Sequence, residues 1–571
     1  MSVSARFDDL VSGRSFRLDT PAATWTAGSL DDVSGALRRV EHEARAGRWV
    51  AGFVSYEAAP GLDPALRTRQ SDPDLPLAWF AAFEEHVDVP APPRVDAADV
   101  TWTADVDAEH HAAAVADVRE RIAAGITYQV NLTHRLTGNV ADPASLYAAM
   151  LHGQRPAYGA LLDTGDHVVA SASPELFFDL DGDALTTRPM KGTIGRGRWS
   201  AEDEARREDL AGSEKDRAEN LMIVDLLRND LGRIARFGTV RVDDLFAIER
   251  YETVWQMTST ISARARADVG LVDVFTALFP CGSVTGAPKS STMAIIAELE
   301  DRPRGVYCGA VGVVEPGMGR AVFSVPIRTV VVDREGDAVY GTGGGITWDS
   351  SATGEWDEAE VKARVLVARR PAFALLETLR LDASGYHALG DHLDRLAASA
   401  RYFGRTVDLD AVRHALAAVE AEPPVVVRLT VDADGAIGVA PRPLPEADGP
   451  VRLAVDPEPI DRHDPFRFHK TTHRTMYEEA SKRFPEADDV VAVDERGQAV
   501  ETTIGNLVVL VDGEWRTPPL DAGCLPGIER ARLLRAGDVV EAPVTVDDLR
   551  RAEAIEVVNS VRGRRAAVLV D

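Results

Sequence analysis

Apolar positions along the chain switch between helical and strand-like spacing and predict an α+β protein. Val115, Val118 and Ile122 recur at helical spacing and predict a helix over 107–124 that Gly125 ends. Residues 127–136 then alternate as in a strand. The same patterns predict helices over 213–235, 351–368 and 391–403, strands over 323–332, 338–340, 425–431, 451–455 and 507–511, and loops over 90–93 and 441–445.

The chain is too long for one hydrophobic core, since it has 571 residues. The proline-rich stretch at 90–93 separates an N-terminal part, 1–95, from a longer segment, 96–368. A second module then covers 372–571, after a short join. No internal repeat relates the two halves, so we expect different folds and different chemistry in each.

Composition narrows the class of partner. The net charge of −28 argues against binding to nucleic acid or to an anionic membrane. The three cysteines show neither metal-ligand spacing nor a disulfide framework, which fits a reducing compartment. No apolar run approaches the ~18 residues that span a bilayer, so we expect a soluble, cytoplasmic protein.

Two carboxylates fall on apolar helical stripes. On its predicted helix Glu219 shares a face with four apolar residues, Met222, Ile223, Leu226 and Leu227. Glu358 repeats this pattern on a second helix. A carboxylate on an apolar face needs a partner, which is either a hard divalent cation such as Mg²⁺ or a buried Lys or Arg. The pattern favours the two equally.

A glycine cluster and an inward arginine could bind an anion. The glycines of 341–345 follow the predicted strand at 338–340 and could offer backbone N–H groups, although most such clusters are only tight turns. Arg328 interrupts the apolar run 323–332. A guanidinium there needs a carboxylate, from either a ligand or an internal salt bridge.

Five motifs in family order now carry a resemblance. They span 171–177, 189–193, 219–230, 279–289 and 355–358. Together they resemble the chorismate-utilising enzymes: anthranilate synthase, isochorismate and salicylate synthases, and aminodeoxychorismate synthase component I. The resemblance covers about 105–368 and implies a two-sheet β-sandwich core with surrounding helices.

Two positions indicate the branch of this family. Isochorismate-forming members carry a water-activating lysine where this chain has Gln129, and a glutamine cannot act as that base. Lys191 matches the lysine typical of aminodeoxychorismate synthases. Gln256 replaces a histidine that anthranilate synthases use for pyruvate elimination, which is a weaker signal.

The resemblance implies roles for individual residues. Glu219 and Glu358 would hold Mg²⁺, Glu175 would protonate the departing 4-hydroxyl, and Lys191 would attack C2 of chorismate before ammonia enters at C4. Burial or cations such as Arg188 would have to lower the pKa of Lys191. The remaining substrate-binding residues would be Gln129, Ser283, Tyr307, Arg328, Gly343, Gly345 and Lys362.

Ammonia needs a source outside this sequence. No Gly-x-Cys-x-Gly nucleophile elbow occurs, so we expect a separate glutamine amidotransferase subunit or the use of free ammonium. Residues 1–95 are assigned only a structural role.

The second module has a different reactive lysine. Lys470 precedes Glu501 and a loop at 523–530 that turns into a helix, where a phosphate could bind the helix N-terminus. With Arg395, this set resembles the fold-type IV pyridoxal phosphate (PLP) enzymes, which are built of two α/β subdomains and include branched-chain and D-amino-acid aminotransferases and aminodeoxychorismate lyase.

This second resemblance implies that Lys470 forms the Schiff base with PLP and that Glu501 keeps the pyridine nitrogen protonated. Arg395, Thr503 and Ile528 would complete the cofactor site. Asn559 and Ser560 match more loosely, and a homodimer through this module is expected.

The neighbouring module decides between lyase and transaminase. The two resemblances together imply synthesis of p-aminobenzoate for folate: amination of chorismate to 4-amino-4-deoxychorismate, then PLP-dependent loss of pyruvate. The alternatives are an anthranilate or 2-amino-2-deoxyisochorismate synthase joined to an aminotransferase, or to an inactive docking domain.

Overall fold

The computed structural model describes residues 3–95, 100–367, 371–444, 446 and 449–570. The chain forms two compact units, and each is described by itself. The first contains residues 1–195 and 207–370, and the second contains 196–206 and 371–571. The helix α4 (Ser200–Gly212) belongs partly to each.

Two ten-stranded sheets form the core of the first unit. In strand order the first sheet contains β16 (Gly286–Ala287), β8 (Gln129–Asn139), β20 (Asp337–Ile346), β19 (Thr329–Val332), β10 (Val168–Ser173), β9 (Tyr158–Asp163), β1 (Ser4–Asp9), β2 (Arg14–Asp19) and β6 (Val87–Asp88), and β7 (Thr103–Ala104) pairs with β8. The second contains β13 (Met190–Gly195), β15 (Val254–Arg264), β12 (Ala184–Arg188), β11 (Leu176–Asp181), β18 (Arg320–Ser324), β17 (Ala310–Val314), β4 (Trp49–Val54), β5 (Ala78–Phe83) and β3 (Ala23–Ala27), and β14 (Arg241–Arg250) pairs with β15. Residues 1–95 thus contribute strands to both sheets.

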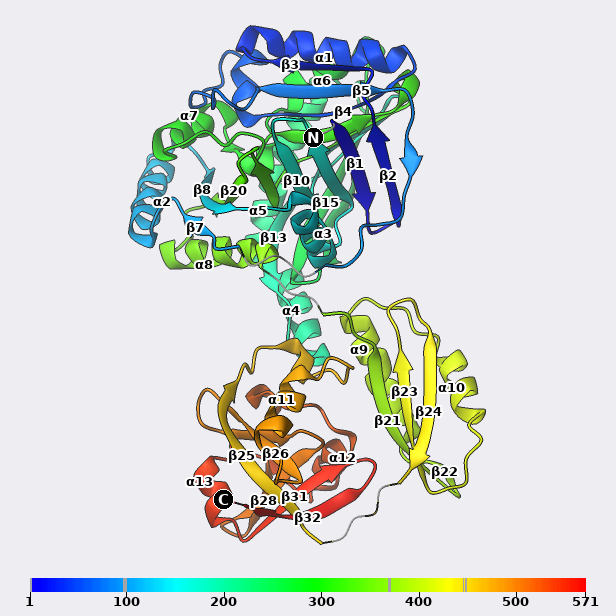
Figure 1. Cartoon of the computed structure of the whole chain (residues 1–571). Coiled ribbons are helices and arrows are strands. Elements are labelled where there is room, and N and C mark those ends of the chain that lie inside the picture. Colours follow the sequence, from blue (N-terminus) through cyan, green and yellow to red (C-terminus); the bar gives the residue numbers. More distant parts are fainter. Residues whose placement is uncertain (1–2, 96–99, 368–370, 445, 447–448, 571) are drawn as a thin grey trace. The chain divides into compact units, whose positions relative to one another are not determined.

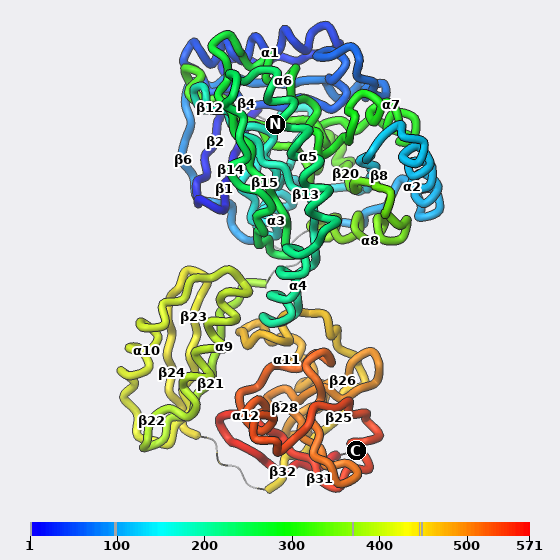
Figure 2. Tube along the Cα trace, turned by 180° about the vertical axis from the view of Figure 1, so that it is seen from behind, coloured from blue at the N-terminus to red at the C-terminus, as the bar shows by residue number. Residues whose placement is uncertain are grey.

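Seven further helices surround these sheets in the described part of the unit: α1 (Leu30–Arg45), α2 (Ala108–Ala123), α3 (Pro143–Gln154), α5 (Glu214–Gly232), α6 (Leu271–Leu278), α7 (Lys289–Leu299) and α8 (Ala352–Ala363). Val33, Leu37 and Val40 form the buried face of α1, which lies over β3–β5 (Figure 1). Figure 2 shows α5 beside β13 and β15 on the other side of the unit. The predicted two-sheet core with surrounding helices is confirmed.

The helices that carry the predicted carboxylates begin at serine caps. Ser213 Oγ accepts a hydrogen bond from the Asp216 amide at the start of α5, and Ser351 Oγ accepts one from the Gly354 amide at the start of α8. The predicted helix at 351–368 ends as α8 at Ala363, followed by a 3₁₀ turn, Arg364–Leu366; Ala368 lies outside the described residues.

Three local predictions need correction. The run 323–332 is not one strand, because β18 belongs to one sheet and β19 to the other, and Arg328 turns the chain between them with φ 52°. The glycines of 341–345 are not a loop after a strand but part of β20 itself. Pro441 and Pro443 lie in the strand β24 (Ile437–Pro443), and Pro445 is outside the described residues. This strand is at the edge of its sheet, where a missing N–H donor is tolerated.

The second unit has two sheets of its own. The small sheet has the order β22 (Gly385–Tyr386), β21 (Leu375–Asp382), β23 (Val425–Val431) and β24, with α9 (Leu389–Tyr402) and α10 (Leu409–Ala417) beside it (Figure 1). The large sheet contains β27 (Ala499–Thr502), β26 (Asp489–Asp494), β25 (Val451–Ile460), β32 (Gly563–Leu569), β31 (Ala554–Asn559), β28 (Asn506–Val511), β29 (Glu514–Thr517) and β30 (Val540–Glu541). Its helices are α11 (Thr475–Arg483), α12 (Ile528–Ala536) and α13 (Val546–Arg551). In the described ranges, no helix combines the length and the apolar character needed to cross a bilayer.

Candidate active sites

A cavity of about 130 Å³ lies in the first unit between β13, β20, α5 and α8. Ten predicted residues line it: Glu175, Lys191, Glu219, Ser283, Tyr307, Arg328, Gly343, Gly345, Glu358 and Lys362. The remaining one, Gln129, is fully buried under Gly345, and neither atom of its side-chain amide is hydrogen-bonded to a residue that the structure describes. The structure therefore brings all eleven together, although they lie far apart in sequence.

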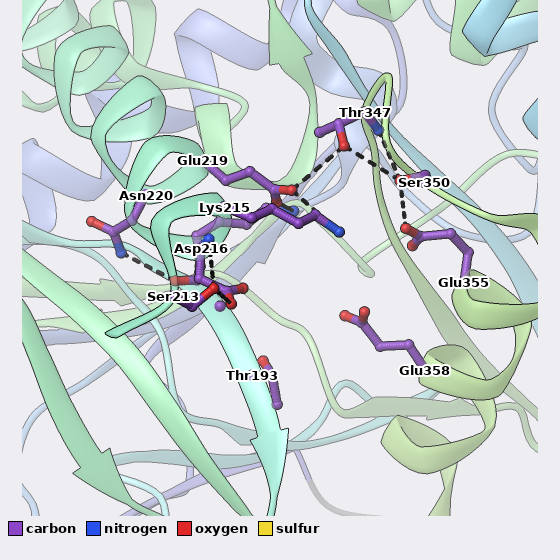
Figure 3. A network of polar contacts seen from close by, with 12 residues as sticks. Thr193, Ser213, Lys215, Asp216, Glu219, Asn220, Thr347, Ser350, Glu355 and Glu358 are labelled. Carbon is purple, nitrogen blue, oxygen red and sulfur yellow. Dashed lines mark hydrogen bonds and ion pairs between the residues drawn. The ribbon is translucent and has the colours of Figure 1, made fainter. Parts of the chain in front are cut away.

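Three carboxylates approach this cavity from two helices. Glu219 projects from α5, and Glu355 and Glu358 project from α8 (Figure 3). Ser350 Oγ donates to Glu355 at 2.6 Å, and Thr347 Oγ1 donates to Glu219 at 3.5 Å. Sequence reasoning missed Glu355, although its position three residues before Glu358 places both on one helix face.

Lysines pair with two of these carboxylates. Lys191 Nζ lies 3.2 Å from Glu219, and Lys362 Nζ lies 2.8 Å from Glu358. Neutralisation by lysine, the alternative to a metal, is thus present in this structure. Within the described residues, no group of three His, Cys, Asp or Glu side chains is arranged to hold a metal by itself. The oxygen donors nevertheless fit Mg²⁺, which keeps waters and shares its ligands with an anionic substrate.

The expectation of a lowered pKa for Lys191 is wrong for this structure. Burial alone would lower the pKa of Lys191, but the carboxylates of Glu219 and Glu358 outweigh it, so the pKa is raised. Arg188 pairs with Glu249 instead of acting on the lysine. Asn220 Nδ2 donates to the Lys191 carbonyl at 3.2 Å, which ties β13 to α5.

Glu175 is a buried acid that lines the cavity. Burial raises the pKa of Glu175 to about 7. A hydrogen bond of 2.5 Å from Ser283 Oγ and the charge of Arg328 both lower this pKa, but their effect is smaller than that of burial. A carboxyl with this pKa is protonated often enough near neutral pH to donate a proton.

Arg328 retains an unpaired charge in the described part of the cavity. Its guanidinium donates to the amide oxygen of Gln154 and lies over the Tyr251 ring, but no carboxylate pairs with it. Burial lowers the pKa of Arg328. A ligand carboxylate is the partner that would compensate this buried charge.

The glycines of β20 leave room for functional side chains. A Cβ on Gly341 would overlap the Tyr307 ring, and one on Gly345 would overlap the Lys191 amine and the Gln129 amide. Among the described residues, β20 pairs beyond Tyr340 with β8 alone, so its other backbone edge faces the cavity. Lys362 Nζ donates to the Gly343 carbonyl at 2.8 Å.

Substitution of Gly345 by alanine should therefore impair the site more than the fold. We expect the catalytic activity of this cavity to fall at least about tenfold, because the new methyl group displaces Lys191 from its position. The measurement is the turnover rate of this site beside a thermal unfolding curve. Gly35→Ala is the matched control, since Gly35 lies in α1 with no atom near its Cβ position; it should keep full activity and gain up to about 1 kcal/mol of stability. Equal rates for Gly345→Ala and the wild type would contradict this reading.

Further polar residues support the cavity wall, among them Gln256, which the family resemblance had singled out. Gln256 Nε2 donates to the Gly192 carbonyl and its Oε1 accepts from Thr193 Oγ1, both at 2.8 Å. Asn131, Lys215 and Asp216 also line the cavity. The long-range pairing of β13 with β15 brings Gln256 to this wall, so its hydrogen bonds to Gly192 and Thr193 could not be predicted from local sequence.

A cavity of about 370 Å³ in the second unit surrounds Lys470. It also contains the other predicted cofactor residues Arg395, Glu501, Thr503 and Ile528, together with Asn559 and Ser560. The Lys470 carbonyl accepts a hydrogen bond from the Leu376 amide at 3.0 Å, which fixes the lysine between the small and large sheets. Burial, then the charges of Arg395 and Arg474, lower the pKa of Lys470 to about 7.

The groups around Lys470 fit a PLP cofactor. Glu501 is buried and accepts from Arg467, from Tyr477 at 2.7 Å and from the Leu525 amide at 3.0 Å, so it can hold a cationic ring nitrogen. Ile528 opens α12, whose N-terminus suits a phosphate.

Two of the predicted cofactor residues are held by acidic neighbours. Arg395 donates to Glu377 at 2.7 and 2.9 Å and to the Pro526 carbonyl, so its charge is already paired beside the α12 loop. Thr503 donates its hydroxyl to Asp489 at 2.6 Å.

Comparison with known proteins agrees with this division. Residues 9–368 match the family described as chorismate binding enzyme, and residues 374–568 match amino-transferase class IV, a class that implies PLP. The structure of anthranilate synthase component I from Streptococcus pneumoniae TIGR4 has a TM-score of 0.55 and 23% identity, and covers 64% of this chain and 92% of that one, which shows a shared fold.

Curated relatives come from two branches of the first family. Aminodeoxychorismate synthase of Streptomyces griseus is 42% identical over 395 residues, 62% of this chain and 54% of that protein. Aminodeoxychorismate synthase component 1 of Klebsiella aerogenes is 37% identical over 288 residues, 50% and 62% of the two chains. Anthranilate synthase component 1 3 of Haloarcula marismortui is 34% identical over 401 residues, 61% and 79%. The chain spans about half the length of the first of these. It belongs to the chorismate-binding enzymes and carries a class IV amino-transferase domain after that region.

Proposed function

We propose that this chain makes p-aminobenzoate from chorismate in two steps, one in each unit. The observation that carries the proposal is the presence of two partly buried lysines in separate cavities, Lys191 beside paired carboxylates and Lys470 in a class IV domain. Residues 96–368, supported by 1–95, would carry the first step, and 372–571 the second. The similarity to aminodeoxychorismate synthases supports the assignment.

In the first step, chorismate would bind in the first cavity beside its carboxylates. Mg²⁺, when bound by Glu219 and Glu358, supplies a Lewis acid for the ring carboxylate. Arg328 would pair with the second carboxylate, because it has no acidic partner among the described residues. Gln129, Ser283, Tyr307, Gly343, Gly345 and Lys362 would line the remaining surface of the substrate.

The bond changes in this step need no oxidant or reductant. Lys191 Nζ forms a bond to C2 as the 4-hydroxyl leaves with a proton from Glu175, so water is released. Ammonia then bonds to C4 and the C2–Nζ bond breaks, which returns the lysine. The attacking amine must first lose its proton, and in this structure Glu219 favours the protonated form.

Replacing Glu175 by glutamine should stop this step selectively. A glutamine keeps the acceptor for Ser283 but has no proton to donate, so we expect chorismate consumption to fall by about 10² to 10⁴. Conversion of supplied 4-amino-4-deoxychorismate should not change. Glu335→Gln, at an exposed turn, is the control for loss of a negative charge. A Glu175→Gln protein that consumes chorismate at the normal rate would remove Glu175 from the mechanism.

The second step would take place at Lys470. PLP, when bound, supplies an electron sink. Lys470 Nζ has a pKa of about 7 and can accept the proton from C4 at neutral pH. Glu501 would hold a proton on the cofactor ring, while Arg395, Thr503 and Ile528 would hold the rest of the cofactor. Loss of pyruvate from C3 leaves an aromatic ring, so this step is strongly downhill.

The partners follow from the chemistry. Ammonia would come from a separate glutamine amidotransferase subunit or from free ammonium, and the class IV domain would provide the surface for a homodimer. We propose a cytoplasmic location, where chorismate, glutamine and PLP are available.

Purified protein supplied with chorismate, ammonium, Mg²⁺ and PLP provides the test. The proposal predicts p-aminobenzoate, and chelation of Mg²⁺ should stop its formation from chorismate but not from supplied 4-amino-4-deoxychorismate. Release of anthranilate would support the alternative of an anthranilate synthase joined to a second enzyme.

A further inference from the structure

The small sheet of the second unit presents two chemically different faces. Side chains alternate along a strand, and Leu375, Leu379 and Val427 pack with α9 and α10 in the core. The residues that alternate with these along the strands point to the opposite face. Four of them line the cavity around Lys470: Thr378, Val426, Arg428 and Arg442. The cavity side of this sheet therefore carries charged side chains.

Arg428 and Arg442 are diagonal neighbours on this face. Val426 pairs with Arg442 across β23 and β24, and Arg428 lies two residues further along β23. Side chains in this arrangement have Cβ atoms about 7–8 Å apart or less, a distance that one carboxylate can bridge between two guanidinium groups.

A third arginine enters the cavity from the large sheet. Arg562 follows β31 in a turn that Asn559 fixes, since Asn559 Oδ1 accepts from the Val561 and Arg562 amides at 3.1 and 2.9 Å. Burial, then the charges of Arg565 and Arg442, lower the pKa of Arg562. The Arg562 guanidinium thus lies close enough to Arg442 for the two charges to repel.

These arginines have no acidic partner in the part of the chain that the structure describes. Arg428, Arg442 and Arg562 take part in none of its ion pairs. The acids nearby are already used, because Glu501 pairs with Arg467 and Glu377 pairs with Arg395. A group of like charges without counter-ions attracts an anion.

The phosphate of a bound cofactor would have a separate site. Arg395, which pairs with Glu377, contacts the Pro526 carbonyl just before α12, so this guanidinium and the helix N-terminus would hold the phosphate together. The other three arginines lie on β23, on β24 and after β31. They remain for a second anionic ligand.

We propose that Arg428, Arg442 and Arg562 bind the carboxylates of the amine that reacts at Lys470, and so restrict this cavity to amines with a carboxylate remote from the amino group. The inference rests on the proposed function, whose intermediate carries its amine at C4, one carboxylate at the opposite ring carbon and a second on the enolpyruvyl group.

This site also excludes the substrates of the rival aminotransferase. An apolar α-amino acid has a single carboxylate, on the carbon that bears the amine. Its apolar side chain would cover the arginines and remove water from them without supplying a counter-ion, which is unfavourable. Selectivity would therefore come partly from rejection of the wrong class of amine.

The test uses the full-length, cofactor-loaded protein with Arg428→Gln, Arg442→Gln and the double variant. The KM for supplied 4-amino-4-deoxychorismate should rise about tenfold for each single variant and about a hundredfold for the double one, with a smaller change in kcat. The dissociation constant of p-aminobenzoate, measured by calorimetry, should rise in parallel. Arg442→Lys should retain part of the affinity that Arg442→Gln loses. Arg413→Gln is the matched control, since Arg413 is an exposed residue of α10, which covers the other face of the same sheet.

The two measurements separate the outcomes. If the wild type converts the intermediate and the double variant keeps its KM and its affinity for p-aminobenzoate, the carboxylate site is wrong while the proposed function stands. A second outcome is that the wild type binds p-aminobenzoate but does not convert the intermediate, while the double variant no longer binds p-aminobenzoate. In that case the proposed function is wrong and the site stands. A wild type that binds no p-aminobenzoate, or a control variant as impaired as the double one, overturns the inference.

Discussion

Replacing Lys470 with alanine should abolish p-aminobenzoate formation and leave 4-amino-4-deoxychorismate to accumulate from chorismate. The expected loss is at least about 10³-fold, because the substitution removes both the attachment point of the cofactor and the base for C4. Lys470, whose pKa is lowered to about 7, is the one lysine among the described residues that line the second cavity, so no other amine there replaces it. Chromatography of the intermediate and product over time measures the effect.

A second readout separates this role from a loss of folding. Borohydride treatment of the wild type should fix the cofactor on the peptide that contains Lys470, and mass spectrometry should find no such mass in Lys470→Ala. Lys482→Ala, an exposed lysine of α11, should retain both attachment and activity. Normal p-aminobenzoate output from Lys470→Ala would refute the assignment.

Replacing Lys191 with alanine should have the opposite pattern. We expect chorismate consumption to fall at least about 10³-fold, since the attacking amine is gone. Supplied 4-amino-4-deoxychorismate should still give p-aminobenzoate at the wild-type rate, because Lys470 and its cavity belong to the other unit. Each lysine variant therefore serves as the folding control for the other. A Lys191→Ala protein that still aminates chorismate would assign the first step to a different group.

Glu219 adds a complication to the Lys191 variant. Removal of the amine leaves Glu219 with Lys215 Nζ at 3.8 Å but without Lys191 Nζ at 3.2 Å, so the substitution removes an ion pair as well as the nucleophile. A Lys191→Arg variant, which keeps a cation near Glu219 but lacks the attacking amine, should be as inactive as Lys191→Ala. Similar losses in both variants would show that the nucleophile and not the ion pair is essential.

The sequence was informative where chemistry and local periodicity coincide. Glu219 and Glu358 could be placed because each lies on an apolar helical stripe, and the structure brings both to one cavity. Lys191 and Lys470 could be placed through their motifs. The environment of Lys191 could not be predicted, because the Glu219 carboxylate that raises its pKa reaches it from α5 through tertiary packing.

Other features depend on topology that apolar periodicity cannot encode. The run 323–332 is mostly apolar and contains no glycine, so its pattern does not signal that Arg328 adopts a positive φ where the chain changes sheets. The prolines of β24 led to the prediction of a loop. A strand accepts them only at the edge of a sheet, and the sequence does not show that β24 is an edge strand. Arg428 and Arg442 were not predicted as site residues from the sequence, because only the register of β23 against β24 places them on the same face.

One measurement tests the central claim, which is that a single chain aminates chorismate at C4 and then aromatises the ring. Purified wild-type protein is given chorismate, ¹⁵N-ammonium, Mg²⁺ and PLP, and the labelled product is identified by NMR. The account predicts ¹⁵N on the ring carbon para to the carboxylate, as in p-aminobenzoate, with labelled 4-amino-4-deoxychorismate preceding it. ¹⁵N ortho to the carboxylate, as in anthranilate, would contradict it.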